Sequence, residues 1–305
     1  MGKKNLKYQS PGINEETRFE KLHTVTFDSS EIASHLIAKE ICELVKSKND
    51  KNKKCVLGFA TGSSPTLIYK EIIRIHKEES ISFKNVIAFN LDEYYPIKKN
   101  DKNSYHHFMN ENLFNHLDIP KENIYIPSGQ VKPNDIEKFC NSYENKIEEY
   151  GGIDLQILGI GRTGHIGFNE PGSHFNSKTR LITLDHTTRF DANKTFGGIE
   201  NVPNTAITMG IRTIFNSKRI IVMAWGIHKS LIVKKAVEGE VTPLIPASYL
   251  QNHKNATFAL DNESASELIK SKTPWIVGTC KWTSLMKRTA VVWLSEITGK
   301  SILKL

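Results

Sequence analysis

The chain has 305 residues, of which 39% are hydrophobic and 24% charged, and its formal net charge is +8 at pH 7. These values are typical of a soluble globular protein and exclude a disordered, collagen-like or disulfide-rich chain. The excess positive charge lies in two segments, residues 46–54 and 281–305, each with five basic residues and one acidic residue. Neither segment interleaves bases with aromatic rings as a single-strand binder would, so we expect no nucleic-acid partner.

The N-terminal sequence MGKKNLKYQSPG has no apolar core of a signal peptide, and no run of about 18 apolar residues follows it. The four cysteines lie far apart, without the spacing of a zinc site or a disulfide framework. We therefore expect a cytoplasmic protein without a membrane partner. Because no repeat or linker is visible, we expect residues 1–305 to form a single α/β domain.

Helices and strands alternate along the chain. Ser29 or Ser30 can cap a first helix, whose apolar residues recur at helical spacing. Four short apolar runs then indicate buried strands: Cys55–Ala60, Val86–Leu91, Ile153–Ile160 and Ile220–Trp225. Helical spacing resumes after the first run, and again from about His228 to Val237. This alternation predicts a Rossmann-like α/β fold, with a mostly parallel sheet flanked by helices and a ligand site beyond the carboxyl ends of its strands.

The segment Gly159–Gly164 has the spacing GxGxxG after a predicted strand, which is the fingerprint of a dinucleotide site. The sequence that follows, HIGFNEPG, is too rich in Gly and Pro to form the helix that receives a pyrophosphate. Asp185 lies at a superficially suitable spacing for a ribose contact, but the missing helix outweighs it. We therefore expect no nicotinamide or flavin cofactor.

The segment Thr61-Gly62-Ser63-Ser64 lies between a predicted strand and a predicted helix. Its backbone N–H groups, its hydroxyls and the dipole of the helix N-terminus suit a phosphate or another anion. An ordinary capped helix after a strand has the same pattern. No Lys follows the glycine, which excludes a Walker A nucleotide loop.

Asp92-Glu93 follows the second predicted strand, where one of the two carboxylates can act as a general base or both can serve a turn and a helix cap. His165 and Glu170 lie five residues apart in the glycine-rich segment, so they can form a pair in which the carboxylate orients the imidazole. His106-His107 and Asp185-His186 lack a third ligand at metal spacing, so we expect no metal site.

Five segments together, in this order and at this spacing, resemble the glucosamine-6-phosphate deaminase/isomerase family over roughly residues 35–270. They are LGFATGSSPTLIYKEI (57–72), FNLDEYYPI (89–97), SYHHFMNENLFNH (104–116), LGIGRTGHIGFNEPGS (158–173) and HKSLIVKKAVEGE (228–240). The resemblance implies a Rossmann-like fold and conversion of glucosamine 6-phosphate and water to fructose 6-phosphate and ammonia. It implies no redox cofactor and no catalytic metal.

By position in these segments, the resemblance implies that Asp92 moves a proton from C2 to C1 of the opened sugar. His165 would help to open the pyranose ring, and Glu170 would hold His165. Ser63, Ser64 and Lys229 would hold the phosphate of this small-molecule partner. The substrate-binding residues expected on this basis are Thr61, Gly62, Ser63, Ser64, Gly161, Arg162 and Lys229.

Two departures from the family pattern affect this expectation. Thr163 stands where the family usually has an Asp before the Gly-His pair, and a neutral hydroxyl predicts slower ring opening. Lys194-Thr195 stands near the position where the family commonly has a phosphate-binding Arg. We hypothesise that Arg162 supplies part of the missing positive charge, since a guanidinium can bind a phosphate through two hydrogen bonds.

Other functions stay open at this point. A 6-phosphogluconolactonase would share the fold and a Gly-His turn, although the segment HIGFNEP matches the deaminase form. A noncatalytic sugar-phosphate-binding module would keep the anion loop and lose the acid and base residues. The family's allosteric site is matched at Ser173 and Arg180 but has Ile182 in place of a Lys, which predicts no allosteric activation.

The segment Trp275–Leu305 is longer than in short members of the family, and it resembles the variant in which the deaminase-like part precedes a second domain. Its apolar residues predict a terminal helix, and we expect residues 275–305 to form an extension packed on the domain. The apolar last residues suggest that the natural chain continues beyond Leu305. The sequence leaves a homo-oligomer open.

Overall fold

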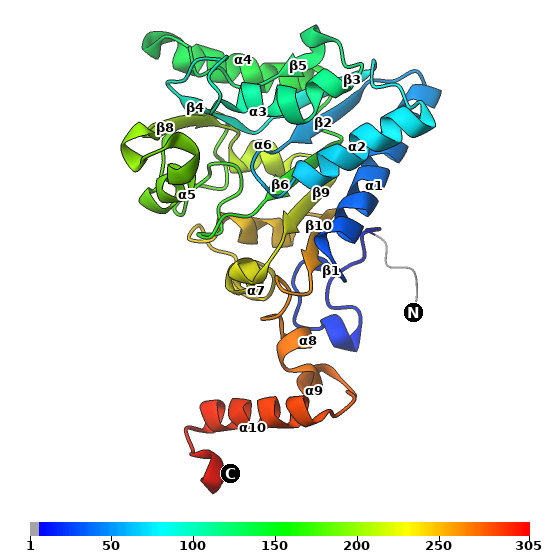
Figure 1. Cartoon of the computed structure of the whole chain (residues 1–305), viewed down its shortest axis with the longest axis vertical. Coiled ribbons are helices and arrows are strands. Elements are labelled where there is room, and N and C mark those ends of the chain that lie inside the picture. Colours follow the sequence, from blue (N-terminus) through cyan, green and yellow to red (C-terminus); the bar gives the residue numbers. More distant parts are fainter. Residues whose placement is uncertain (1–5) are drawn as a thin grey trace.

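A seven-stranded parallel sheet is the centre of the computed structural model. The structure describes residues 6–305, and residues 1–5 lie outside this description. The strands of the sheet are β1 (His23–Phe27), β2 (Cys55–Phe59), β3 (Val86–Asn90), β5 (Ile124–Tyr125), β6 (Leu155–Gly159), β9 (Ile220–Ala224) and β10 (Ala256–Asp261). They lie in the order β1-β10-β9-β6-β2-β3-β5, and all neighbouring pairs are parallel (Figure 1). This confirms the predicted Rossmann-like α/β fold and all four predicted strands.

Helices cover both faces of this sheet. One face packs against α1 (Ser30–Asp50), α2 (Thr66–Glu79) and α3 (Tyr105–Asn112), and the other against α4 (Ile136–Glu149), α6 (Ile211–Phe215) and α7 (Ser230–Glu238). Short 3-10 helices lie at Glu15–Thr17, Phe114–His116, Lys121–Asn123, Pro133–Asp135, Ile199–Asn201, Ile227–Lys229, Pro246–Asn252 and Ile302–Lys304. Successive side chains of a strand point to opposite faces, so Ile221 joins one core and Val222 the other.

The first predicted helix begins where its cap was expected. The hydroxyl of Ser29 accepts a hydrogen bond from the backbone N–H of Ile32, which satisfies one of the free donors at the start of α1. The basic segment 46–54 is helical as far as Asp50. Within it, Lys48 pairs with the carboxylate of Asp154 at 2.8 Å, so part of its charge serves the fold.

A second sheet, which we did not predict from the sequence, lies beside the first. It contains β4 (Asp92–Tyr95), β7 (Arg180–Thr183) and β8 (Thr205–Thr208) in the antiparallel order β4-β8-β7. The helix α5 (His186–Phe196) lies beside β8 at the edge of the molecule (Figure 1). Asp92 and Glu93, expected in a turn, are the first residues of β4, and Leu91 is the single residue between β3 and β4.

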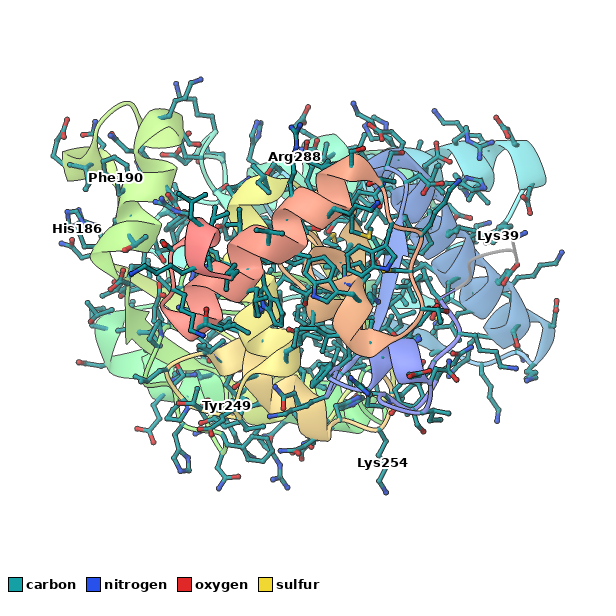
Figure 2. The ribbon with its side chains drawn as sticks, turned by 90° about the horizontal axis from the view of Figure 1, so that it is seen from below. Lys39, His186, Phe190, Tyr249, Lys254 and Arg288 are labelled. Carbon is teal, nitrogen blue, oxygen red and sulfur yellow. The ribbon has the colours of Figure 1, made fainter. Side chains whose placement is uncertain are left out.

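The C-terminal segment contains α8 (Ile269–Lys272), α9 (Pro274–Val277) and α10 (Ser284–Thr298). The expectation that residues 275–305 pack on the domain does not hold for α10, which has no buried residue. Val277 is the last buried apolar residue, and α10 meets the rest of the chain through an edge contact between Trp293 and Trp275, whose ring centroids are 5.9 Å apart. Figure 2 shows α10, which carries Arg288, crossing this end of the molecule.

Exposed apolar side chains are concentrated on α10. Leu285 is 75% exposed and Ile297 59%, because apolar residues occur on several sides of the helix and no other element within residues 6–305 covers them. None of the helices in residues 6–305 combines the length and apolar character that crossing a bilayer would require.

Candidate active site

A cavity of about 630 Å³ lies at the carboxyl ends of the central strands, as the topology of a parallel sheet predicts. The predicted site residues that line it are Thr61, Gly62, Ser63, Ser64, Asp92, Gly161, His165 and Lys229. Glu170 and Arg162 do not line it. A second, more open cavity of about 810 Å³, next to the loop that carries Lys98, contains none of the predicted residues. The predicted site residues therefore lie in the smaller of these two cavities, and cavity size alone would not have pointed to them.

One end of the cavity is suited to an anion. The segment 61–64 connects β2 to α2, and Gly62 has φ +97°, a backbone conformation that side chains rarely adopt. Lys229 donates a hydrogen bond from Nζ to the carbonyl of Ile160 at 2.8 Å. Burial lowers the pKa of Lys229, and the carboxylate of Asp191 partly counters this effect. A partly buried ammonium with one carbonyl partner keeps two N–H groups for a ligand.

His165 lies in the cavity wall with its Nδ1 engaged by two side chains. Nδ1 is 2.9 Å from Oγ1 of Thr163 and 3.2 Å from Oε2 of Glu170, so the structure brings the predicted His-Glu pair together. The ring lies against Gly161: a Cβ at residue 161 would be 2.1 Å from Nε2 of His165. Glycine at this position is therefore required for the observed ring position, which leaves Nε2 for the cavity.

Glu170 lies behind His165 and is only 12% exposed. Burial acts to raise the pKa of Glu170, but the hydrogen bond and charge of His165, with contacts to Thr188 and Asp185, outweigh burial and lower it. The imidazole is thus held by an acid that stays ionised at lower pH than an ordinary glutamate. This arrangement suits a histidine that exchanges protons through its other nitrogen.

Asp92 is 5% exposed and has no basic side chain at hydrogen-bond distance among the described contacts. Burial, and after it the neighbouring carboxylate of Glu93, raises the pKa of Asp92 well above its ordinary value, while the backbone N–H of Phe168 partly offsets this. Gly167 allows close approach, since a Cβ there would lie 3.3 Å from Oδ2 of Asp92. A buried carboxylate with a raised pKa is suited to remove a proton from carbon.

Sequence reasoning missed several cavity residues. They are Tyr94, Lys102, Tyr105, Phe168, Thr188 and Asp191, while Thr195, named in the sequence only as part of a departure from the family pattern, also lines the cavity. The rings of Tyr105 and Phe168 stack with centroids 5.8 Å apart and form an apolar wall. Tyr94 follows Asp92-Glu93 directly, so its position beside that motif was an available signal. The residues of α5 had no such signal, because only one residue of this helix, Thr188, is buried.

Arg162 lies at the edge of the site. Its guanidinium binds the carboxylate of Asp191 through two hydrogen bonds, one of them 3.1 Å from Nε to Oδ2. Both side chains are 45% exposed. Arg162 therefore holds α5 at the entrance, and in this structure its charge is balanced by Asp191 before any substrate enters.

The glycine-rich segment 159–164 does not open into a helix. The next helix of the chain is α5, and Asp185 caps it by accepting a hydrogen bond from the backbone N–H of Thr187 at 2.7 Å. Asp185 thus has a structural role in place of a ribose contact. Among residues 6–305, no three His, Cys, Asp or Glu side chains are grouped so that they could hold a metal ion.

The two residues that match the family's allosteric site lie together. Arg180 donates one hydrogen bond to Oδ1 of Asn169 at 2.9 Å and another to Oγ of Ser173 at 3.2 Å. Burial lowers the pKa of Arg180. Ile182 lies two residues further along β7.

Comparisons with known proteins agree with this geometry. The profile of the family described as glucosamine-6-phosphate isomerases/6-phosphogluconolactonase matches residues 28–259. A glucosamine-6-phosphate deaminase of Clostridium novyi is 47% identical over 232 residues, which cover 76% of this chain and 95% of that protein. A glucosamine-6-phosphate deaminase-like protein of Bacteroides thetaiotaomicron is 46% identical over 95% of this chain, but the chain spans only 44% of its length.

Solved structures give the same result. A structure described as a monomeric glucosamine-6-phosphate deaminase is 40% identical, with a TM-score of 0.77, and covers 81% of this chain and 100% of its own. A 6-phosphogluconolactonase from Trypanosoma brucei has a TM-score of 0.65 over 82% of this chain and 99% of its own, but it is 19% identical. The second likeness therefore concerns the fold alone.

Proposed function

Because this chain belongs to the family of glucosamine-6-phosphate isomerases and 6-phosphogluconolactonases, we propose that it is an enzyme that converts glucosamine 6-phosphate and water to fructose 6-phosphate and ammonia. One observation carries the proposal: Asp92, His165 and the anion-binding segment 61–64 face a single cavity of about 630 Å³. This volume is within the range that small-molecule sites occupy.

The phosphate binds at the end of the cavity formed by the segment 61–64 and Lys229. Backbone N–H groups and the hydroxyls of Ser63 and Ser64 donate hydrogen bonds to it, and Lys229 supplies the positive charge. Phosphate binding in turn stabilises the charged form of Lys229, whose pKa burial lowers. The sugar then extends toward Asp92 and His165.

Proton transfers account for the chemistry. His165, through Nε2, gives a proton to the ring oxygen as the O1 hydroxyl loses one, which opens the pyranose to the aldehyde. Asp92 removes the proton from C2 while O1 gains a proton, and the resulting enol amine is protonated at C1. The product is an iminium at C2. Water adds to this carbon, ammonia leaves, and the C2 carbonyl of fructose 6-phosphate forms.

Thr163 supports a modified form of this ring opening. With Nδ1 of His165 protonated, Oγ1 of Thr163 accepts a hydrogen bond from it and Glu170 lies beside it, which keeps Nε2 directed to the cavity. The hydroxyl orients the ring but adds no charge, so Glu170 is the carboxylate that stabilises the protonated ring. Slower ring opening than in members with an aspartate at this position is the expected cost.

The relatives that are 45–47% identical to this chain and that it covers almost completely are named deaminases, whereas the 6-phosphogluconolactonases share the fold at 17–21% identity. A noncatalytic binding module would have no need of a buried base and a histidine paired to an acid in the same cavity. The sequence identities thus favour a deaminase over a lactonase, and the acid and base residues favour an enzyme over a binding module.

We further propose that residues 1–305 form a single α/β domain with an extension at 275–305, and that the protein acts in the cytoplasm. Its partner is the sugar phosphate, and neither nucleic acid nor a membrane is required. The solved relative is described as monomeric. Size-exclusion chromatography with light scattering would distinguish a monomer from a homo-oligomer.

The test is release of ammonia and fructose 6-phosphate from glucosamine 6-phosphate, with Asp92→Asn as the catalytic variant and Asp50→Asn, at the exposed end of α1, as the matched control. We expect turnover by the native chain and by D50N, and loss of at least about 100-fold in D92N. Sugar-phosphate binding without turnover would favour the binding module. Hydrolysis of 6-phosphogluconolactone without ammonia release would favour the lactonase.

A further inference from the structure

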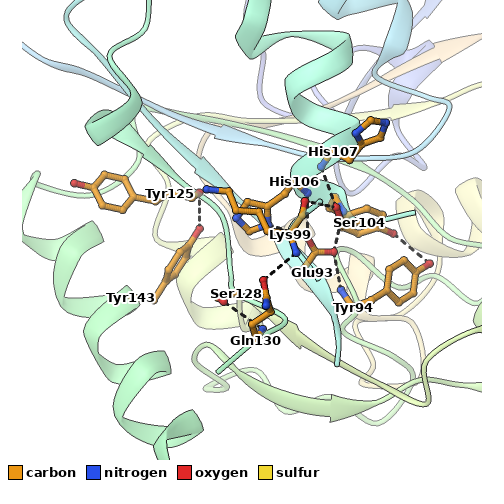
Figure 3. A network of polar contacts seen from close by, with 11 residues as sticks. Glu93, Tyr94, Lys99, Ser104, His106, His107, Tyr125, Ser128, Gln130 and Tyr143 are labelled. Atoms are coloured by element: carbon orange, nitrogen blue, oxygen red, sulfur yellow. Dashed lines mark hydrogen bonds and ion pairs between the residues drawn. The ribbon is translucent and has the colours of Figure 1, made fainter. Parts of the chain in front are cut away.

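Glu93 is the most completely bonded carboxylate next to the site, although it does not line the cavity. It is 0% exposed, and its two oxygens accept four hydrogen bonds (Figure 3). Oε1 accepts from the backbone N–H groups of Tyr94 at 3.0 Å and Tyr105 at 2.8 Å. Oε2 accepts from the backbone N–H of His106 at 3.0 Å and from its ring Nδ1 at 2.9 Å.

Three of these contacts come from backbone N–H groups, which can only donate, so both oxygens of Glu93 act as hydrogen-bond acceptors. An ionised carboxylate, which only accepts hydrogen bonds, fits this arrangement, and Nδ1 of His106 then donates the fourth bond. The side chain of His106 is 12% exposed, so the pair is largely removed from water and its position is well defined.

The contacts of Glu93 connect two elements that form the site. Glu93 belongs to β4, and the N–H groups of Tyr105 and His106 are free donors in the first turn of α3. The ring of Tyr105 stacks on that of Phe168, and the backbone N–H of Phe168 contacts Asp92. By holding the start of α3 against β4, Glu93 therefore fixes the wall beside Asp92.

Glu93 also lies directly behind Asp92. Consecutive side chains of a strand point to opposite faces, so Asp92 points into the cavity and Glu93 away from it. The other ionisable groups that face Asp92 are Tyr94 on β4, Tyr105 on α3 and Tyr143 on α4, with His165, Asp191 and Lys229 around the cavity. Among the described groups, Glu93 is the carboxylate whose charge, after burial, raises the pKa of Asp92.

We propose that Glu93, paired with His106, is a positioning residue for Asp92: it fixes α3 against β4 and places a negative charge behind the base. This inference rests on the proposed function, in which Asp92 removes the proton from C2. The prediction is that the pair sets both the rate of that step and the pH at which Asp92 becomes ionised.

The first test compares Glu93→Gln with the native chain in the pH dependence of kcat/KM for glucosamine 6-phosphate. Asp92 must be ionised to act, so activity rises as pH rises through its pKa. Removing the adjacent negative charge lowers that pKa, and we expect the acidic limb to move to lower pH. We also expect kcat to fall by about tenfold or more, with KM changed less. A lower Tm with an unmoved limb and an unchanged kcat would overturn the proposal.

If E93Q fails to fold, a second pair of variants, at His106, tests the proposal. Asn can place its amide nitrogen near the position of Nδ1, so we expect His106→Asn to keep most of kcat and His106→Leu to lose it about tenfold. His107→Asn on the same helix is the matched control, since no contact of its side chain with Glu93 is present in the described structure. Equal kcat and equal acidic limbs in H106N and H106L would contradict the proposal.

One readout separates this inference from the proposed function. The titration of Asp92, followed through its carboxyl ¹³C shift in labelled protein, needs no substrate. If the native chain releases no ammonia, the proposed function fails, while a lower titration midpoint of Asp92 in E93Q still supports the positioning role. If the native chain is active and the titration midpoint of Asp92 is unchanged in E93Q, the positioning role is contradicted and the proposed function still stands.

Discussion

The hydroxyl oxygen of Thr163 lies 2.9 Å from Nδ1 of His165, on the side of the ring that also faces Glu170 at 3.2 Å. A neutral oxygen and a carboxylate thus share one ring nitrogen. The hydroxyl of Thr163 can be removed or kept by substituting this one side chain, so its contact with His165 can be tested directly.

Thr163→Val removes the hydroxyl and keeps the branched shape of the side chain. We expect kcat to fall about two- to tenfold, which corresponds to the loss of one hydrogen bond. Thr163→Ser, which keeps the hydroxyl, should stay close to the native rate. Steady-state kinetics of both variants are the measurement, and equal rates in T163V and T163S would mean that the hydroxyl does not orient His165.

Gly161→Ala should inactivate the enzyme without unfolding it. The added Cβ would lie 2.1 Å from Nε2 of His165, and the imidazole can relieve this contact only by leaving its position. We expect kcat to fall at least about 100-fold, while circular dichroism shows a folded protein. Gly159→Ala is the matched control, because its Cβ would be no closer than 3.9 Å to Ser64. Similar kcat values for the two variants would contradict this account.

The raised pKa of Asp92 has a consequence for stability. The folded protein favours the protonated carboxyl, so this stabilisation is present below the ordinary pKa of an aspartate and is lost as pH rises through the raised pKa. Asp92→Asn should therefore increase Tm at pH 8 by about 2–4 °C, the shift expected for roughly 1 kcal/mol, and change it little at pH 4. Thermal melts at both pH values test this. A decrease in Tm at pH 8 would show that ionised Asp92 is not destabilising.

Asp191 should weaken substrate binding, because its carboxylate balances Arg162 and lies near Lys229. We expect Asp191→Ala to lower KM for glucosamine 6-phosphate and Arg162→Ala to raise it, each about two- to fivefold, as for exposed charges. Lys194→Ala, on the same helix but outside the cavity lining, is the matched control. An unchanged KM in R162A would exclude Arg162 from phosphate binding.

Removing residues 282–305 should leave the enzyme folded and active. The helix α10 has no buried residue, and Trp282 and Trp293 contact the rest of the chain at Trp275. Because surface groups contribute little to the free energy of unfolding, we expect Tm to change by less than about 2 °C and kcat to stay the same. A larger loss of Tm would mean that α10 stabilises the domain through contacts that its exposure does not reveal.

The sequence could predict the seven-stranded sheet in part because its strands are apolar on both faces. The runs 55–60, 86–91, 153–160 and 220–225 are continuous, since helices cover both sides of the sheet. The second sheet had no such signal. Its strands have four residues each, and β4 pairs with β8 more than 100 residues away in the chain, so neither length nor local pattern identified them.

The candidate site residues that belong to a recognisable sequence motif could be predicted. Asp92, His165, Lys229 and the segment 61–64 stand at strand ends and meet as the topology requires. The ion pair of Arg162 with Asp191 was not predictable, because it joins a loop to a helix 29 residues away that only tertiary structure places over the cavity. The role of Glu93 as a cap for α3 was one of two alternatives open in the sequence, and the structure identifies it.

The single residue between β3 and β4 affects which sugars can react. Leu91 accepts a hydrogen bond from the N–H of Met209 and donates one to Phe59, so the two sheets meet at a fixed joint. The segment 61–64, proposed to bind the phosphate, follows β2 of the larger sheet, and Asp92 belongs to the smaller one. In the proposed mechanism a substrate spans this joint, with a phosphorus-to-C2 distance set by its own covalent bonds. A hexosamine phosphorylated at C1 in place of C6 would bring a different carbon to Asp92, so the joint would distinguish positional isomers.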